Sequence, residues 1–265
     1  MPEMPEVEAV CRRLRLEAEG AAIRRMRILR PGIVKPQRVS DIEDACRKTR
    51  LTQVERRGKN ILLHVSRGGV LHIHLRMTGN LYVVPDHRFL VTAVRAVWEL
   101  ADGRGIVFED PRALGRIQLL AADSLPEVGV DPLDEAFTPE VLAALAKGSR
   151  KPSKLFLLDQ DKVAGLGNIY AAEALYRAGI NPLKEMGSLR KDRIRRLHAA
   201  IVAVMGGAVA SVYAKYVKPG QMIGAEEADL FVYDREGDPC RVCGRAIKRI
   251  PQGGRSTYFC GFCQK

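Results

Sequence analysis

Two pairs of cysteines near the end of the chain constrain its fold most. Cys240 and Cys243 form one Cys-x-x-Cys pair, and Cys260 and Cys263 form a second pair sixteen residues later. Two such pairs supply four thiolates, the number of ligands that tetrahedral zinc needs. Because four protein ligands leave no open position, the sequence predicts one structural Zn²⁺ in a compact hairpin module. Disulfide bonds are the alternative, but the absence of a recognisable secretory signal disfavours them.

The charge of the chain indicates a polyanionic partner. Lys and Arg number 43 against 31 Asp and Glu, a formal net charge of +12. Such a charge favours DNA or RNA binding, because neutralised phosphates release condensed counterions. A solvated basic surface is the alternative interpretation. The basic residues recur along the chain, which suits a long groove, and they gather at 56–59, 150–151, 190–196 and 241–255.

We expect a cytoplasmic, nucleoid-associated monomer that contacts no membrane. No apolar run is expected to approach the roughly 18 residues that a membrane helix needs. Acidic residues at positions 3, 6 and 8 stand where a signal peptide would carry basic ones.

The first 130 residues are predicted to form an antiparallel β-sandwich behind an N-terminal helix. Helical spacing of apolar residues, with a proline in the first turn and Gly20 after the last, predicts a helix over 5–19. Short apolar runs between turn residues predict strands over 23–29, 51–56, 61–65, 70–75, 91–100, 106–109 and 117–120. His72 and His74 alternate on one of these strands, and we interpret them as a hydrogen-bonded pair, not as metal ligands.

The pattern becomes helical after Gly129–Leu133. Helices are predicted over 138–147, 154–158, 169–178 and 189–205, and a mobile loop over 211–227. The predicted fold class is therefore α+β, with three domains: a β-sandwich over 1–130, a helical domain over 134–230 and a zinc finger over 231–265. Between the two Cys-x-x-Cys pairs of the finger lie four cations that are suited to phosphates, namely Arg245, Lys248, Arg249 and Arg255.

The N-terminal sequence suggests covalent chemistry. Removal of Met1 would expose Pro2 as a secondary amine, which can attack a sugar carbon and form an iminium. An α-amino pKa near 8 leaves part of this amine unprotonated at neutral pH. Glu3 beside it is a candidate general acid/base, although an acid at a helix start also serves as a partner of the helix dipole.

Together with the cysteine pairs, this N-terminus resembles the formamidopyrimidine-DNA glycosylase family. Further resemblances follow in the family's order: a lysine-bearing turn, a methionine loop, an arginine loop, the core of a helix–two-turn–helix motif, and the arginine at the tip of the finger hairpin. In this chain they are 57–59, 75–79, 110–112, 165–171 and Arg255. The resemblance covers nearly the whole chain.

The resemblance implies a DNA glycosylase that is also an AP lyase. It implies that Pro2 attacks C1′ of a damaged nucleotide in double-stranded DNA and that Glu3 protonates the opening sugar. Lys59 would assist β-elimination, and Arg255, with Lys59, would hold phosphates and assist δ-elimination. Glu6 would support the first helix. A set of DNA contacts is also implied, comprising Met77, Arg95, Arg112, Leu114, Arg150, Lys154 and Asn168.

These roles agree with the physics of reaching a paired base. The base must leave the stack at a cost of a few kcal/mol. Met77, Arg112 and Leu114 are expected to occupy the space it vacates. Asn168 begins a predicted helix, and a helix start is a natural site for a phosphate.

Several positions depart from the family's pattern. Ala113 and Leu114 replace an arginine and a phenylalanine, and Arg95 stands where a phosphate-binding histidine is usual. Residues 208–210 replace a usual pair of threonines. Three hypotheses therefore stay open: a glycosylase/lyase for oxidised purines, the same chemistry directed at oxidised pyrimidines, and a non-catalytic zinc-dependent nucleic-acid-binding protein. The methionine loop favours the first, and Pro2 with Glu3 disfavours the third.

Overall fold

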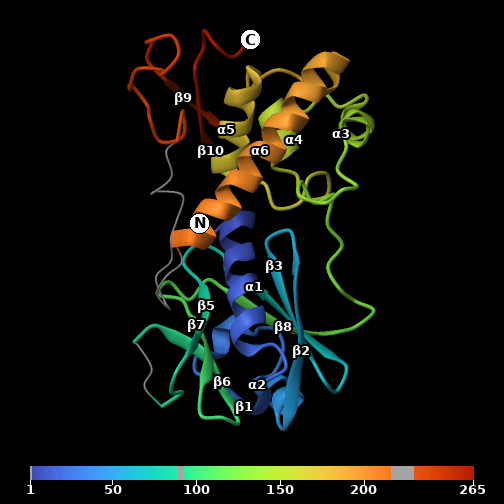
Figure 1. Ribbon diagram of the computed structural model, residues 1–265, viewed down its shortest axis with the longest axis vertical. Coiled ribbons are helices and arrows are strands. Elements are labelled where there is room, and N and C mark those ends of the chain that lie inside the picture. Colours follow the sequence, from blue (N-terminus) through green and yellow to red (C-terminus); the bar gives the residue numbers. More distant parts are fainter. Residues whose placement is uncertain (1, 89–91, 216–229) are drawn as a thin grey trace. The chain divides into compact units, whose positions relative to one another are not determined.

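The computed structural model describes residues 2–88, 92–215 and 230–265, and these residues form two compact units (Figure 1). Among them, unit 1 contains 2–88, 92–126 and 212–215, and unit 2 contains 127–211 and 230–265. The sheet of the predicted sandwich lies in unit 1. The predicted helical domain and the finger lie together in unit 2.

Unit 1 begins with a helix that is followed by strands. Its helices are α1 (Met4–Ala18) and α2 (Val39–Cys46), and a short 3-10 turn, η1 (Pro31–Ile33), lies between β1 and α2. Its strands are β1 (Ala22–Ile28), β2 (Thr49–Arg57), β3 (Asn60–Val65), β4 (Gly69–His74), β5 (Asn80–Val84), β6 (Val94–Leu100), β7 (Gly105–Glu109) and β8 (Arg116–Ala121).

The strands of unit 1 form the predicted antiparallel sandwich. Their order is β5-β7-β6-β1-β2-β3-β4-β8, and every neighbouring pair is antiparallel. Strands β1 and β2 pair over two positions only, Ala22 with Arg50 and Ile23 with Thr49. This short join lets the sheet fold into two halves that share one apolar core.

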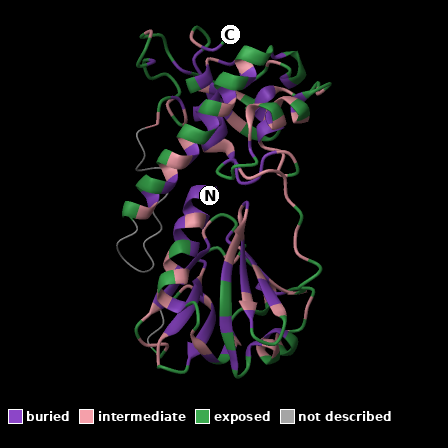
Figure 2. Ribbon diagram, turned by 45° about the vertical axis from the view of Figure 1, so that its right-hand side comes forward, coloured by how far each residue is buried: buried purple, intermediate pink, exposed green. Residues whose placement is uncertain are grey.

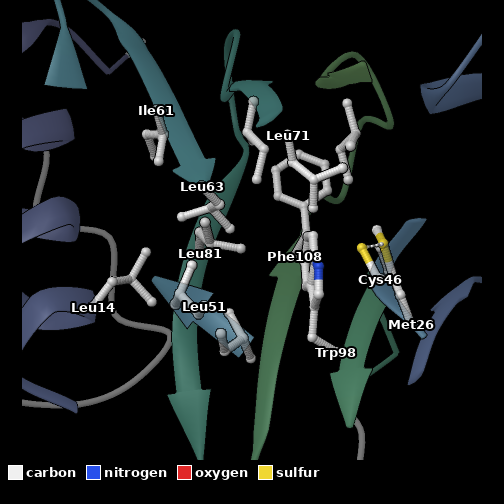
Figure 3. Close-up of a cluster of buried hydrophobic side chains, with 14 of the residues drawn as sticks. Leu14, Met26, Cys46, Leu51, Ile61, Leu63, Leu71, Leu81, Trp98 and Phe108 are labelled. Carbon is white, nitrogen blue, oxygen red and sulfur yellow. Dashed lines mark hydrogen bonds between the residues drawn. The ribbon is translucent and has the colours of Figure 1, made fainter. Parts of the chain in front are cut away.

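The core of unit 1 lies between those halves and under α1. Trp98 and Phe108 come from one half, and Leu63 and Leu71 come from the other (Figure 3). All four are at most 1% exposed. Leu14 of α1 faces the same cluster, so burial of one apolar stripe fixes the helix on the sheet. Figure 2 shows the buried and exposed sides of this helix.

Unit 2 contains the predicted helices and the finger hairpin. Its helices are α3 (Pro139–Ala146), α4 (Ser153–Leu157), α5 (Asn168–Ala178) and α6 (Lys191–Lys215), with a 3-10 turn, η2 (Met186–Ser188), before α6. The last four residues of α6, 212–215, belong to unit 1. The hairpin strands are β9 (Lys248–Gln252) and β10 (Arg255–Phe259), which pair antiparallel.

Three local predictions need correction. Helix α2 and strand β5 were not predicted, because α2 is only eight residues long and β5 follows the methionine loop without a strong turn signal. Residues 211–215 continue α6, so the predicted loop is wrong there, and its remainder, 216–227, lies outside the described residues. Val91, the predicted first residue of a strand, also lies outside them, and the strand β6 begins at Val94.

Helix α6 is more apolar than the sequence analysis expected. Its length and a mean hydropathy of 1.8 over its most apolar window would suffice to cross a membrane, so the expectation that no such stretch exists was wrong. The side chains of Ile194, Leu197, Ile201 and Met205 are buried at helical spacing. One apolar stripe of α6 is therefore packed against the rest of the protein.

Candidate active site and nucleic-acid interface

The predicted nucleophile and acid lie directly before the first turn of α1, and Glu3 is the N-cap of the helix. Pro2 and Glu3 are both buried, and Glu3 is only 1% exposed. The Glu6 carboxylate accepts a hydrogen bond of 2.7 Å from the backbone N–H of Glu3, as part of a capping box. This bond fixes the backbone that carries Pro2 and Glu3, so Glu6 supports the site as expected.

Lys59 lies in the tight turn between β2 and β3. Gly58 before it has a φ of +57°, a left-handed conformation that favours glycine. The Arg56 guanidinium donates to the Glu8 carboxylate of α1 at 2.7 Å and to the Gly58 carbonyl at 3.1 Å. Burial raises the pKa of Glu8, but the hydrogen bond and charge of Arg56 bring it below the usual value. An ionised Glu8 therefore ties the turn that carries Lys59 to helix α1.

The methionine and arginine loops lie at the same end of the strands as this turn. Asn60 is the register partner of His74, and His74 is the partner of Arg116. Residues 58–59, 75–79 and 110–115 directly precede or follow these three aligned positions. The lysine turn and both loops therefore lie together at one end of the strands of unit 1.

A single buried carboxylate connects the two loops. Asp110 is 0% exposed, and it accepts hydrogen bonds from the Thr78 hydroxyl of one loop and from the Gly115 N–H of the other, the latter at 2.7 Å. Met77 and Leu114 keep 42% and 40% of their surface exposed on either side of this connection. Large apolar side chains exposed on fixed loops are suited to entering a base stack.

The backbone of both loops is held in an uncommon conformation. Arg76, next to Met77, has a φ of +59°, and Ala113, next to Leu114, has a φ of +51°. Left-handed conformations of residues other than glycine cost energy and persist where the surroundings over-determine them, often at functional sites. Here the hydrogen bonds of Asp110 provide that support.

Arg95 supports the arginine loop through two hydrogen bonds. Its Nε donates to the Asp110 carbonyl at 2.7 Å, and Nη2 donates to the Pro111 carbonyl at 3.1 Å. These bonds hold the loop that carries the exposed Arg112. The phosphate contact that the resemblance implied for Arg95 stays a prediction.

The histidines of β4 make hydrogen bonds, as predicted. His72 bonds through Nε2 to the Asn60 side chain at 2.8 Å, and His74 Nδ1 accepts from the Arg76 N–H at 3.0 Å. Burial, with the nearby charges of Arg76 and Lys59, lowers the pKa of His74 to about 4. His74 is therefore neutral at physiological pH and adds no charge beside Lys59.

In unit 2, helix α5 begins at Asn168. Its side-chain amide donates to the Ser256 carbonyl of the finger hairpin at 3.1 Å. Within the described chain, the buried Oδ1 atom of Asn168 has no hydrogen-bond partner. The start of a helix carries a partial positive charge that favours phosphate. A phosphate contact at Asn168 stays a prediction.

Lys154 has a different environment from the expected one. The resemblance placed it at the DNA backbone, but its side chain is 0% exposed. Its ammonium donates to the Ser256 carbonyl at 2.8 Å and to the Thr257 hydroxyl at 2.6 Å. Because a buried ammonium requires such partners, Lys154 contacts the hairpin and does not present its charge to solvent. Its direct role is to position the residues that follow Arg255.

Arg255 and Arg150 are exposed cations. Arg255 begins β10 directly after Gly253 and Gly254, which both have left-handed φ values. Within the residues that the structure describes, its guanidinium makes no hydrogen bond or ion pair, and the same holds for Arg150. Both side chains are therefore available to phosphates.

The four cysteines of the finger form a metal-binding set. Their sulfur atoms lie within 4.8 Å of one another, with separations of 3.9 Å between Cys240 and Cys263 and 3.5 Å between Cys243 and Cys260. A tetrahedron with Zn–S bonds of about 2.3 Å has edges of about 3.8 Å, so the residues fit Zn²⁺. Such a closed site would connect the two Cys-x-x-Cys pairs and would take no part in catalysis.

Helix α5 also holds the segment that leads into the finger. The Glu173 carboxylate accepts hydrogen bonds of 2.9 Å from the backbone N–H groups of Phe231, Val232 and Tyr233. The Tyr176 hydroxyl lies 3.2 Å from the Cys240 sulfur. One helix therefore contacts the hairpin near its tip, the segment at residues 231–233 that leads into the finger, and the metal site.

Family models match three consecutive parts of the chain. The formamidopyrimidine-DNA glycosylase N-terminal domain matches residues 1–117, and the formamidopyrimidine-DNA glycosylase H2TH domain matches 128–216. The zinc finger found in FPG and IleRS matches 237–265.

The chain belongs to the formamidopyrimidine-DNA glycosylase family. It is 39% identical over 272 residues to the formamidopyrimidine-DNA glycosylase of Xanthomonas oryzae pv. oryzae strain PXO99A and 36% identical over 274 residues to that of Pelotomaculum thermopropionicum. The alignments cover all of this chain and at least 99% of each relative.

Solved structures of formamidopyrimidine-DNA glycosylases have the same fold. The Lactococcus lactis enzyme, bound non-covalently to DNA with an AP site, is 29% identical with a TM-score of 0.87. MutM in complex with DNA containing carbocyclic 8-oxo-G is 29% identical with a TM-score of 0.90. Each comparison covers both chains completely.

The structural roles of two buried carboxylates were not predicted from the sequence. Asp110 was quoted only as part of a motif, and Glu173 was read only as part of a helix. Both are nearly fully buried, with exposures of 0% and 6%, and both accept hydrogen bonds from segments far along the chain or across a loop. Only a charged residue on the apolar face of a predicted helix could have drawn attention to Glu173.

Proposed function

We propose that this protein is a bifunctional base-excision-repair DNA glycosylase and AP lyase that removes oxidised purines of the formamidopyrimidine and 8-oxoguanine type from double-stranded DNA. The observation that carries the proposal is the buried Glu3 directly after Pro2, at the start of a helix that Glu6 caps. Membership of the glycosylase family over the whole chain supplies the substrate class.

The proposed reaction begins at the Pro2 nitrogen, which becomes a secondary amine when Met1 is removed. Its lone pair attacks C1′, the bond from C1′ to the damaged base breaks, and the base leaves with the bonding pair and a proton that replaces the one lost from the amine nitrogen. Glu3 protonates the O4′ atom, the bond from C1′ to O4′ breaks, and the nitrogen lone pair forms an iminium between C1′ and the Pro2 nitrogen. Loss of protons from the sugar then expels the 3′ and 5′ phosphates in turn, and water hydrolyses the iminium.

Other residues bind the substrate in this proposal. Lys59 and Arg255 hold phosphates next to the lesion and assist the two eliminations. Met77, Arg112 and Leu114 fill the gap in the duplex after the damaged base has left the stack. Arg150 and Asn168 bind the DNA backbone, while Arg95 and Lys154 position the segments that carry Arg112 and Arg255.

We further propose a monomer in the cytoplasm, associated with the nucleoid. In this proposal the chain divides by task into 1–130 for catalysis, 134–230 for backbone binding and 231–265 for the zinc finger. Its proposed cofactor is one structural zinc ion.

Borohydride trapping tests the proposal, because the reagent reduces the iminium to a stable protein–DNA bond. The protein is incubated with duplexes that each contain one lesion, and trapping is expected with oxidised purines. A variant that retains Met1 has an amide at Pro2, whose lone pair is delocalised, so trapping should disappear. Undiminished trapping by that variant would remove Pro2 from the mechanism. Preferential trapping on oxidised pyrimidines would reassign the substrate, and binding without trapping would indicate a non-catalytic protein.

A further inference from the structure

The cysteine end of the finger exposes large apolar side chains to solvent. Val242 lies inside the first Cys-x-x-Cys pair and is 75% exposed, and Phe262 lies inside the second pair and is 46% exposed. Phe231, in the segment that leads into the finger, is 41% exposed. Single exposed apolar residues are ordinary, but several together indicate a surface that another molecule covers.

Cationic side chains connect these three residues into one surface. The Arg241 guanidinium lies 5.0 Å from the centre of the Phe231 ring, and this arginine directly precedes the exposed valine. The Arg245 guanidinium lies 3.8 Å from the centre of the Phe262 ring, and the Lys265 ammonium lies 5.9 Å from it. We call the three apolar residues, together with these three cations, the finger patch.

The finger patch is positively charged even beside the metal site. Four thiolates and one Zn²⁺ would leave two formal negative charges there, which the three cations of the patch outnumber. Two neighbouring carboxylates already have arginine partners: Asp238 pairs with Arg235 at 3.1 Å, and Glu236 pairs with Arg249 at 3.3 Å. Among the described residues, no carboxylate forms an ion pair with Arg245. The patch is therefore complementary to a negatively charged partner.

The arrangement of the rings favours a peptide over a nucleic acid. Proteins bind single strands by stacking the bases on open aromatic faces. Here the Phe262 ring has Arg245 over its face. The Phe231 ring has Arg241 over it, and Tyr176 stacks against it with the ring centres 5.7 Å apart. The ring edges and the valine still offer contacts to an aliphatic side chain, and a stacked guanidinium keeps its in-plane N–H groups for a carboxylate.

The finger patch lies at the end of the hairpin that is remote from Arg255. The first Cys-x-x-Cys pair precedes β9 and the second follows β10, whereas Arg255 follows the turn at 253–254 that joins the two strands. Each strand has five residues, which corresponds to about 17 Å at 3.3 Å per residue. A partner on the patch therefore leaves the tip of the hairpin free.

We infer that the finger patch is a docking site for an acidic segment of a partner protein that also carries an apolar side chain. The apolar side chain packs on Val242 and the ring edges, and the carboxylates of the segment bind Arg245 and Lys265. A surface this small suits a transient complex, with a Kd on the order of 10–100 µM. A second copy of this chain does not fit, because two identical positive patches repel each other. The inference adds a protein-binding site to the finger and does not depend on the proposed reaction.

Fluorescence anisotropy of labelled peptides tests the inference on the whole zinc-loaded chain. The test peptide is rich in glutamate and contains one leucine and one phenylalanine. One control peptide has serine in place of both apolar residues, and the other has glutamine in place of every glutamate. The test peptide should bind at least about 5-fold more tightly than either control, because the site requires both charge and apolar contact. Equal affinity for the test peptide and either control would overturn the inference.

Variants of the patch locate the peptide. Val242→Ser removes an exposed apolar side chain and should weaken binding of the test peptide roughly 5–10-fold. Arg245→Ala should weaken it by a similar factor. Leu16→Ser is the matched control, since Leu16 is 73% exposed on α1 and lies outside the finger, and it should keep the full affinity. Unchanged affinity in Val242→Ser would place the peptide elsewhere and overturn the inference.

Further measurements separate other roles of the finger patch, and each positive result contradicts the inference. If Arg245→Ala loses zinc faster to a chelator while its zinc-loaded form binds the test peptide normally, the cations serve the metal site. If Val242→Ser weakens binding of oligothymidylate but not of the peptide, the patch binds nucleic acid. If a duplex with a tetrahydrofuran abasic analogue displaces the peptide, the two share one site. Self-association that Val242→Ser abolishes would identify a second copy as the occupant.

Discussion

At the scale of single residues, the site depends on carboxylates with different tasks. Glu3 is buried next to the predicted amine, whereas Glu6 accepts the Glu3 N–H and holds the helix start. Glu3→Gln keeps the shape of the side chain and removes its proton. Base release should therefore fall by the roughly 10²–10⁴-fold typical of a general acid/base. Single-turnover kinetics on a lesion duplex measures this loss.

Duplex affinity is the control for that variant. Glu3→Gln should leave it nearly unchanged, whereas Lys59→Ala should lower both affinity and base release, because Lys59 is proposed to touch a phosphate. Equal losses of affinity and turnover in Glu3→Gln would assign Glu3 a structural role.

At the scale of elements, α5 is the helix that holds the finger. Asn168, Glu173 and Tyr176 contact the hairpin, the segment that leads into the finger and Cys240. The carboxylate of Glu173 accepts three hydrogen bonds from backbone N–H groups, whereas the amide in Glu173→Gln has only one oxygen that can accept them. An unsatisfied buried group costs roughly 1–3 kcal/mol, so the segment at residues 231–233 should open more often. Hydrogen exchange at residues 231–233 should accelerate by about 5–100-fold.

The exposed Glu140 of α3 is a matched control, because Glu140→Gln removes a charge of the same kind without a buried partner. It should leave exchange at residues 231–233 unaltered. If Glu173→Gln exchanged no faster than this control, the attachment of the finger would have to come from the zinc site and Lys154 instead.

At the scale of the whole molecule, a buried carboxylate makes the stability of the sandwich depend on pH. Glu99 on β6 is 1% exposed and pairs with Arg24, Arg25 and Arg27 of β1 at 2.8–3.1 Å. Burial raises the pKa of Glu99, but the hydrogen bonds from Arg25 and Arg24 lower it to about 2. Because the folded pKa is below the unfolded value of 4.5, the stabilisation is complete above pH 4.5 and is lost as pH falls toward 2.

Glu99→Gln should therefore lower the free energy of unfolding by roughly 1–3 kcal/mol at pH 7, and by much less at pH 2. Urea unfolding at both values of pH measures the difference. Asp102→Asn is the control, since its carboxylate is exposed at the end of β6. An equal loss at pH 2 and pH 7 would show that Glu99 acts through packing and not through charge.

Much of the fold could be predicted because its signals are local. The cysteine spacing predicted the zinc module, and the alternation of apolar residues predicted most strands of the sandwich. Helix α2 and strand β5 were missed because short elements owe their conformation to packing against the sheet more than to their own pattern. The last turns of α6 were missed because small residues give weak helical periodicity.

The sequence by itself determined which reactive and ligating groups are present: a proline amine beside a glutamate, four thiolates, and cations that can bind phosphate. Tertiary structure alone decided which charges face solvent. Lys154 and Arg255 are both cations of the proposed interface, yet the first is buried against the hairpin and the second is exposed. Likewise, Arg245 and Arg249 are both cations of the finger, yet the first lies over the Phe262 ring and the second lines an open pocket of the hairpin. The physical reason is that ligand spacing is a property of neighbouring residues, whereas burial depends on which distant elements pack together.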